Sequence, residues 1–122
     1  MTKSVIKMSK KNTNWLDSLN FKKLNGLIPV VVQHKETCEV LMVGFTNREA
    51  LELTLDTGFL HFFSRTKQRL WKKGETSGNT LKTHSILTDC DNDALVVKVL
   101  PSGPVCHTGK PSCFFNPPIL LK

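Results

Sequence analysis

The chain has 122 residues and a mass of 13.7 kDa, which fits one domain, because single hydrophobic cores of roughly 100–150 residues are the commonest size. Its 39% hydrophobic and 22% charged residues argue against a disordered or low-complexity chain. No apolar run approaches the roughly 20 residues that cross a bilayer, and the first residues lack the apolar stretch of a secretory signal. We therefore expect a cytoplasmic protein without a membrane partner.

The formal net charge of +7 is concentrated near the N-terminus. Residues 1–24 contain six of the 17 basic residues but only one of the 10 acidic ones. We expect residues 1–13 to be a basic, partly disordered arm that aids solubility rather than a nucleic-acid arm, since the first ten positions lack aromatic residues for base stacking. We assign a single domain to residues 14–115 and a short tail to residues 116–122.

The start of the domain predicts a short helix and a β-hairpin. Residues 14–21 are typical of a short helix or turn. The apolar runs 27–32 and 40–45 are separated by a polar turn, which predicts two antiparallel strands. Pro29 lies in the first run, and because proline cannot donate to a ladder we expect an edge strand or the start of one.

A longer helix is predicted over residues 47–57. Thr46, followed three residues later by Glu49, has the pattern of a capping box, and Gly58 is a typical helix stop. The helix packs on the sheet through an apolar side made of Ala50, Leu51 and Leu55.

Further strands are predicted over residues 59–64, 70–72, 80–88 and 94–100, and the rest of the chain reads as loop. Strict alternation in the third of these strands divides it into two faces, one formed by Leu81, Thr83, Ser85 and Leu87. The fold class is therefore mainly β with minor α, that is, α+β.

Three aspartates stand at the turn between the last two predicted strands. Asp89, Asp91 and Asp93 alternate, so an extended chain presents their carboxylates together. Several carboxylates suit a hard cation such as Mg²⁺, which retains waters and takes few protein ligands. The alternative is an ordinary acidic hairpin turn, because aspartate and asparagine are common in turns.

Three of the four cysteines form a spaced set near the C-terminal end of the domain. Cys90, Cys106 and Cys113 offer three soft ligands, and His107 follows the second of them. A zinc ion with three protein ligands and one open position is typical of a catalytic site. The alternative is that each cysteine is a small buried hydrophobe, which is our reading of Cys38.

Residues 64–78 combine cations, hydroxyls, a glycine-bounded loop and Trp71. Arginine forks, lysines and loop amides bind phosphate, and an indole can stack on a base, so a nucleotide is the expected ligand. The alternative is a solvated basic hairpin with a core tryptophan.

Four motifs in this order resemble one family. They are SRTKQRLWKKGETSG at 64–78, DCDNDAL at 89–95, GPVCHTG at 103–109 and SCF at 112–114. Together they resemble phosphoribosyl-AMP cyclohydrolase of histidine biosynthesis, and the resemblance covers roughly residues 14–115.

The resemblance implies hydrolysis of 1-(5-phosphoribosyl)-AMP at the N1–C6 bond of the adenine ring, the third step of histidine biosynthesis, by a zinc-activated water with magnesium assistance. The product is the phosphoribosyl formimino-carboxamide imidazole nucleotide. The family fold is a sheet-rich, barrel-like, intertwined homodimer. One Zn²⁺ per subunit is then held across the interface by Cys90 of one chain and by Cys106 and Cys113 of the other. Mg²⁺ is held by Asp89, Asp91 and Asp93.

Within this reading we assign further roles, and the choice of base rests on the place of His107 next to Cys106. His107 is the expected general base, with His84 as the second choice. The expected substrate contacts are Ser64, Arg65, Arg69, Trp71, Lys73, Gly74, Glu75, Thr76, Ser77 and Gly78. Many members of the family carry a fused second domain, and we expect this chain to be the stand-alone form.

Two other functions compete with this reading. A zinc-stabilised nucleic-acid-binding module would use the basic arm and the cations at 65–73, but the aspartates would repel phosphate unless a divalent metal covered them. A deaminase-like hydrolase would share the zinc-activated water, but the sequence lacks the H-x-E and P-C-x-x-C signature of those enzymes.

Overall fold

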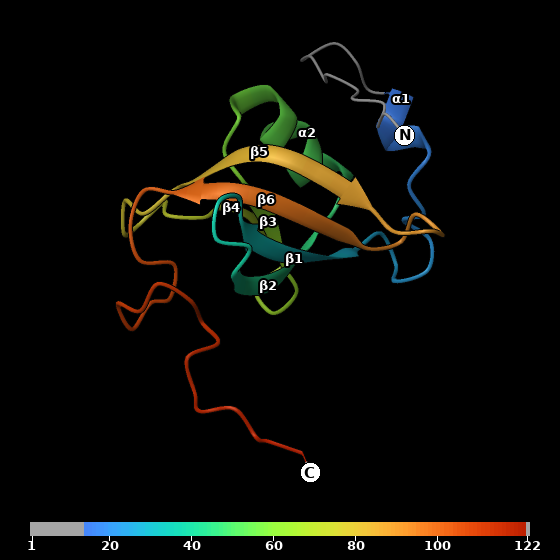
Figure 1. Ribbon diagram of the computed structural model, residues 1–122. Helices are drawn as coiled ribbons and strands as arrows, with labels where there is room; N and C mark the ends of the chain where they lie inside the picture. The colour runs from blue at the N-terminus through green and yellow to red at the C-terminus, as the bar shows by residue number, and fades with distance from the viewer. Residues whose placement is uncertain (1–13, 122) are drawn as a thin grey trace.

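The computed structural model describes residues 14–121, so the predicted basic arm at 1–13 lies outside the described residues. The elements are ordered α1 (Asn14–Asp17), β1 (Ile28–His34), β2 (Val40–Thr46), α2 (Arg48–Thr57), β3 (His61–Ser64), β4 (Arg69–Lys72), β5 (Leu81–Thr88) and β6 (Leu95–Pro101) (Figure 1). Six strands and two helices over this range confirm the α+β class. Neither helix has the length and apolar character that crossing a bilayer requires.

Four strands form one sheet in the order β2-β1-β6-β5. The predicted hairpin is confirmed, because β1 pairs antiparallel with β2. On its other side β1 pairs parallel with β6, from Val30 opposite Leu95 to His34 opposite Val99, and β6 pairs antiparallel with β5.

The expected barrel is wrong, because these sheets do not close. A barrel needs a continuous ladder from one edge strand to the other. The edge strands of the four-stranded sheet are β2 and β5, and β3 pairs with β4 in a separate two-stranded sheet. The segment before β3 reaches β5 through the isolated bridge between Phe59 and Lys82, which leaves the far edge at β2 unclosed.

An edge position for β1 is wrong, because this strand lies between β2 and β6, but Pro29 does stand at the start of the strand, as its second residue. Pro29 is tolerated there for a local reason. The ladder between β1 and β6 begins only at Val30, so the missing N–H of Pro29 stands ahead of it.

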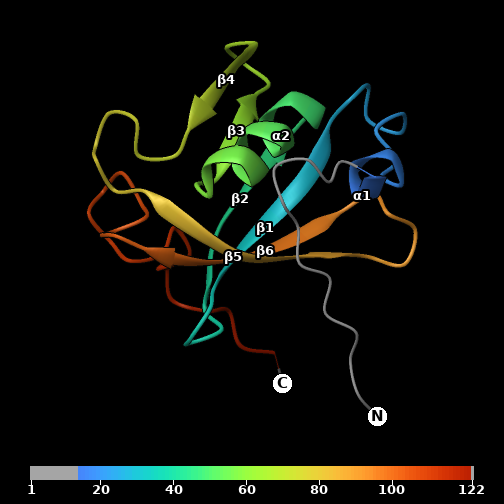
Figure 2. The same ribbon diagram turned by 90° about the horizontal axis from the view of Figure 1, so that it is seen from above.

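The core lies between the four-stranded sheet and a layer made of α2 and the β3–β4 pair (Figure 2). Alternate residues of β1 and β6 face it, and all six are buried: Ile28, Val30, Val32, Leu95, Val97 and Val99. Phe62 of β3 is fully buried against β2, where a Cβ added at Gly44 would come within 2.7 Å of the phenyl ring. This close approach explains the glycine inside β2.

Strand β5 departs from the strict alternation expected of it. Its register against β6 shifts between Thr83 and Ser85, which is a β-bulge at His84. The extra residue exchanges the two faces, so Ile86 packs against the core and Leu87 is 41% exposed. The prediction that Leu87 shares a face with Leu81 is therefore wrong.

Helix α2 begins one residue later than the capping box predicted. Asn47 is the N-cap, and its Oδ1 accepts a hydrogen bond of 2.8 Å from the N–H of Ala50. Thr46 instead ends β2, where it is buried and its hydroxyl donates to the carbonyl of Asn47. The predicted stop is confirmed, because Gly58 adopts a left-handed φ of 81° and its N–H donates to the carbonyl of Thr54.

The position of the cap can be tested by substitution. Asn47→Ala removes the side-chain acceptor at the helix start, so we expect it to lower the free energy of unfolding by about 1 kcal/mol in urea titrations. The control is Glu49→Ala, which removes the carboxylate that a capping box requires; since Asn47 is the cap, we expect it to cost only the weaker interaction of a first-turn acid with the helix dipole, about 0.3–1 kcal/mol. A larger loss in Glu49→Ala than in Asn47→Ala would contradict this cap.

Candidate active site

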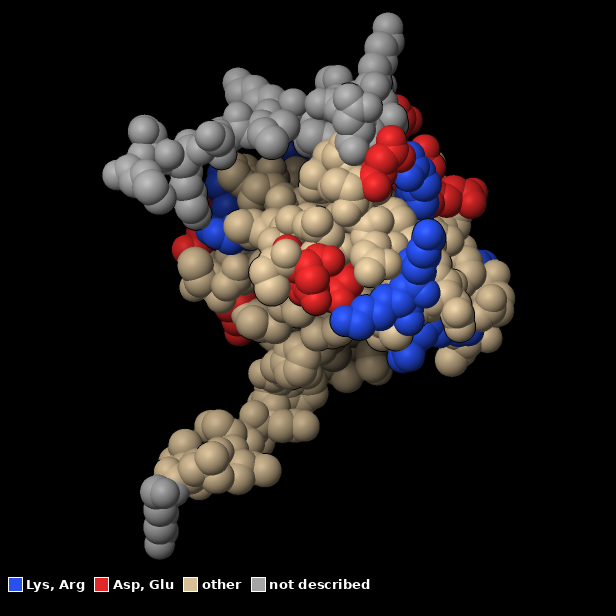
Figure 3. Space-filling view, turned by 90° about the vertical axis from the view of Figure 1, so that its right-hand side faces the viewer, with Lys and Arg blue, Asp and Glu red and all other residues tan. Residues whose placement is uncertain are grey.

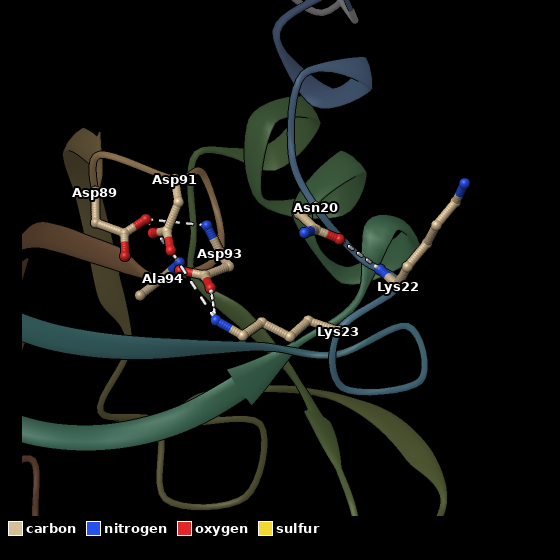
Figure 4. Close-up of polar contacts among 7 residues, drawn as sticks. All are labelled: Asn20, Lys22, Lys23, Asp89, Asp91, Asp93 and Ala94. Carbon is tan, nitrogen blue, oxygen red and sulfur yellow. Dashed lines mark hydrogen bonds and ion pairs between the residues drawn. The ribbon is translucent and has the colours of Figure 1, made fainter.

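The three aspartates converge at the β5–β6 turn, at the end of the sheet that Figure 4 enlarges. One carboxylate oxygen from each of Asp89, Asp91 and Asp93 lies within 4.8 Å of the other two. Asp89 folds the turn, because its Oδ1 accepts hydrogen bonds from the N–H groups of Asp93 at 2.9 Å and Ala94 at 3.2 Å. Three carboxylates gathered in this way are a suitable donor set for a divalent cation.

Lys23 reaches into the same cluster from the segment between α1 and β1, and sequence reasoning missed it. Its Nζ lies 2.5 Å from Oδ2 of Asp93 and 4.0 Å from Oδ2 of Asp91. This hydrogen bond lowers the pKa of Asp93 to about 2 and raises the pKa of Lys23, whereas hydrogen bonding with Asp93 and Asp89 raises the pKa of Asp91. Figure 3 shows acidic and basic side chains next to one another on this end of the molecule.

Two of the three predicted zinc ligands lie together in the loop after β6. The thiols of Cys106 and Cys113 lie close enough to affect each other's pKa. The hydroxyl of Thr108 donates to Sγ of Cys106 at 3.1 Å, which lowers the pKa of that thiol. Burial raises the pKa of the Cys113 thiol.

This thiol loop is anchored on the body of the protein. Val105 is buried in the core, and the N–H of Cys113 donates to the carbonyl of Leu41 in β2 at 2.8 Å. The buried hydroxyl of Ser112 donates to the carbonyl of Val40 at 2.7 Å and accepts from the N–H of Phe114 at 3.0 Å. Two β2 carbonyls therefore fix the position of Cys113.

Cys90 does not join the other two cysteines within one chain. It lies in the turn before β6, and Cys106 lies in the loop after β6, so the strand separates them. A strand of seven residues spans roughly 20 Å, whereas zinc-bound sulfurs lie about 2.3 Å from the metal. Among residues 14–121, the aspartate trio is the one group of three or more potential metal ligands whose donor atoms converge.

A cavity of about 360 Å³ lies against the β3–β4 sheet and the loop after it. Most of the predicted substrate contacts line it: Ser64, Arg69, Trp71, Lys73, Gly74, Glu75, Thr76 and Ser77. Lys67 and Lys72 also line it and were not among the predicted contacts, although both lie inside the basic motif. Arg65 and Gly78 are not among the lining residues. The guanidinium of Arg65 instead stacks 4.0 Å from the ring centroid of Phe45.

Charges inside the cavity are partly paired. Nη2 of Arg69 lies 2.9 Å from Oε1 of Glu75, which holds the guanidinium in place. The ammonium of Lys73 lies 5.9 Å from the ring centroid of Trp71. Trp71 also packs on the buried ring of Phe62 at 5.1 Å between centroids, so the indole is both a wall of the cavity and part of the core boundary.

The cavity and the thiol loop are joined. The loop over 74–78 approaches the segment after β6 through Asn79, which sits so close to Gly74 and Gly103 that a Cβ at either glycine would come within 2.4 Å of it. Ser102 and Thr80 hydrogen-bond across the same junction. The charge of Lys73 favours the thiolate of both cysteines, although burial still raises the pKa of Cys113.

The two candidate bases occupy different places. His107 is exposed on the thiol loop, directly after Cys106, whereas His84 is exposed in the middle of β5 at the bulge. Only His107 therefore shares a loop with the two thiols.

These features define a class of protein: a small strand-rich enzyme domain with a basic cavity that suits a phosphorylated ligand and lies next to a loop with two thiols. The family model for phosphoribosyl-AMP cyclohydrolase matches residues 42–115. The chain is 50% identical over 101 residues to the phosphoribosyl-AMP cyclohydrolase of Listeria innocua serovar 6a and 52% identical over 101 residues to that of Cenarchaeum symbiosum. Each alignment covers 83% of this chain and 94% of the relative. The chain belongs to the phosphoribosyl-AMP cyclohydrolase family, as its motifs indicated.

Other relatives are longer. The histidine biosynthesis bifunctional protein HisIE of Bacteroides thetaiotaomicron is 56% identical over 96 residues, which are 79% of this chain and 47% of that protein. The chain thus spans about half the length of the bifunctional relatives that it matches.

The anchoring of the thiol loop leads to a prediction for Ser112→Ala. The substitution removes one donor and one acceptor at a buried position, so we expect the free energy of unfolding to fall by about 1–3 kcal/mol in urea titrations followed by tryptophan fluorescence. The control is Ser18→Ala, which removes a hydrogen bond at an exposed position and should change stability by about 0.5 kcal/mol or less. Equal effects of the two substitutions would show that the buried hydroxyl does not anchor the loop.

Proposed function

We propose that the chain hydrolyses 1-(5-phosphoribosyl)-AMP at the N1–C6 bond of the adenine ring, the third step of histidine biosynthesis. The observation that carries this proposal is the family match, together with about 50% identity to relatives of that name over nearly their whole length. In the reaction, water adds its oxygen to C6, the N1–C6 bond breaks and N1 gains a proton. The new oxygen and the amino group on C6 become the carboxamide of the imidazole product.

The basic cavity is the proposed binding site for the phosphorylated substrate. Lys67, Lys72 and Lys73 offer point charges, and the hydroxyls of Thr76 and Ser77 and the amides of the glycine loop offer hydrogen bonds to phosphate oxygens. Arg69 is already oriented by Glu75, so its fork loses little conformational freedom on binding. Trp71 provides an aromatic wall against which a purine can stack.

The thiol loop supports the proposed zinc site. Zinc binds thiolates, and the Thr108 hydrogen bond lowers the pKa of Cys106 and so favours its thiolate form. Cys113 is close enough to share the same ion. When bound, zinc supplies a Lewis acid that lowers the pKa of water. His107 would take the proton released by the attacking water and return a proton to N1, with His84 as the alternative base.

The third proposed thiolate has to come from a second chain. Because β6 separates Cys90 from the thiol loop, a site with all three cysteines is complete only if Cys90 of one copy meets Cys106 and Cys113 of another. We therefore propose a homodimer with two shared sites, in which each chain contributes both halves.

One face of the sheet supports this proposal. Strand pairing places Val43 opposite Val31, Val31 opposite Val96 and Val96 opposite Leu87, so one apolar row crosses all four strands. These residues face away from the core, and Val43 and Leu87 are 50% and 41% exposed. Continuous apolar residues on an exposed sheet face are typical of an interface, and the row ends three residues before Cys90.

The aspartate cluster supports the proposed Mg²⁺ site, because three oxygens of hard-ligand type converge there. Bound there, Mg²⁺ would neutralise the carboxylates and allow substrate phosphate to approach. A cytoplasmic location is part of the same proposal, since thiolate ligands persist where the surroundings are reducing.

Turnover is the direct test. We expect purified protein to convert phosphoribosyl-AMP with the absorbance change of ring opening, to lose this activity to a chelator and to regain it when Zn²⁺ and Mg²⁺ are restored. The control is AMP, which lacks the N1 substituent and should not react. No turnover by zinc-loaded protein would overturn the proposed reaction.

Sharing of the zinc site can be tested by mixing two inactive variants. In a homodimer of either variant, Cys90→Ser or Cys106→Ser, both zinc sites lack one cysteine. In a mixed dimer, however, one of the two sites keeps all three cysteines. Co-expression of the two variants should therefore restore about one quarter of the wild-type activity and zinc content, by random pairing. A zinc site built within one chain would give no restoration.

A further inference from the structure

The ammonium of Lys23 occupies the place where a divalent cation would bind the aspartates. It contacts two of the three carboxylates of the convergent donor set, with Oδ2 of Asp93 at 2.5 Å and Oδ2 of Asp91 at 4.0 Å (Figure 4). Lys22, its neighbour, is directed away from the cluster in the same view. The ammonium of Lys23 thus partly compensates the negative charge of the three carboxylates.

Backbone hydrogen bonds position Lys23 next to the aspartates independently of its side chain. The N–H of Asn20 donates to the carbonyl of Asn92 at 2.7 Å, and the N–H of Gly26 donates to the carbonyl of Phe21 at 2.6 Å. The segment before β1 is therefore attached to the β5–β6 turn on its own account. Removing the ammonium should therefore leave the backbone hydrogen bond between this segment and the β5–β6 turn in place.

The side chain is free to leave while its partner stays. The Lys23 side chain is 61% exposed, whereas that of Asp93 is 12% exposed and Asp89 is held by two backbone amides. Mg²⁺ binds carboxylate oxygens at about 2.0–2.1 Å, so an ammonium on the same oxygens would lie within a few ångströms of the ion. Repulsion between the two cations makes joint occupancy unfavourable.

We propose that Lys23 is a tethered competitor of Mg²⁺, which occupies the carboxylates of Asp91 and Asp93 in the metal-free protein and swings into solvent when the divalent ion binds. This inference rests on the proposed magnesium site. The lysine is a positioning residue with two opposite effects. It keeps the metal-free cluster assembled by compensating its charge, and it weakens the affinity for divalent cations.

The test compares Lys23→Met with Lys22→Met, which removes the same charge from the adjacent position. Mg²⁺ alone is titrated into zinc-loaded, Mg²⁺-free protein by calorimetry, and the melting temperature of the Mg²⁺-free protein is measured in parallel. We expect Lys23→Met to bind Mg²⁺ roughly three- to tenfold more tightly and to melt at a lower temperature. Lys22→Met should match the wild type in both measurements.

Two further variants fix the interpretation. Lys23→Arg keeps the charge and should restore a Kd close to that of the wild type, and Asp91→Asn should weaken Mg²⁺ binding in every background. An unchanged or higher Kd in Lys23→Met would overturn the competition, because a merely structural lysine lowers stability without raising affinity. An absence of Mg²⁺ binding in both wild type and Lys23→Met would overturn it as well. Turnover of phosphoribosyl-AMP by the same wild-type sample separates that result from failure of the proposed reaction.

Discussion

Strand β6 is the element on which the rest of the structure depends. It pairs with β1 on one side and with β5 on the other, and its residues Leu95, Val97 and Val99 are buried in the core. Each end of the strand continues into one half of the candidate active site: the aspartate turn precedes it and the thiol loop follows it. A rigid, buried strand therefore fixes the distance between the two halves, and that distance leaves the cysteine set incomplete within one chain.

The basic cavity is coupled to the thiol loop by close packing rather than by charge alone. Asn79 fills the space that glycines 74 and 103 leave open, and Ser102 bonds to Thr80 across the same junction. A loop that carries phosphate-binding groups is thus held against a loop that carries metal-binding groups. This arrangement requires small residues at two positions that lie 29 residues apart in the sequence, and a side chain at either position would push the loops apart.

Local signals in the sequence predicted the elements that depend on neighbouring residues. The hairpin, helix α2 with its stop at Gly58, and the aspartate turn all follow from spacing within a few residues. Features that depend on distant pairing were not predictable in this way. Pro29 left both an edge strand and the start of a strand open, because the parallel ladder with β6 is invisible in a local window. The bulge at His84 and the arrival of Lys23 at Asp93, 70 residues away, arise from the same kind of long-range contact.

The cap of α2 shows a smaller limit of sequence patterns. Thr46 and Asn47 both have side chains that cap helices, and only the burial of Thr46 at the end of β2 decides between them. Similarly, the cysteine spacing was compatible with one site, and the strand between the two groups rules that arrangement out within a single chain. Burial and strand length cannot be read from residue spacing, so spacing alone could make neither decision; only the family resemblance had implied that the cysteines are divided between two chains.

The parallel pairing of β1 with β6 has a consequence for how the chain folds. The centre of the sheet forms only when residues near position 30 pair with residues near position 95. This pairing closes a loop of some 65 residues. During synthesis β1 has only β2 as a partner until the last strand emerges from the ribosome. Proteins dominated by such distant contacts fold slowly compared with helical bundles. The open side of β1 is thus an exposed strand edge in the nascent chain, where chaperones or premature association between chains would act first.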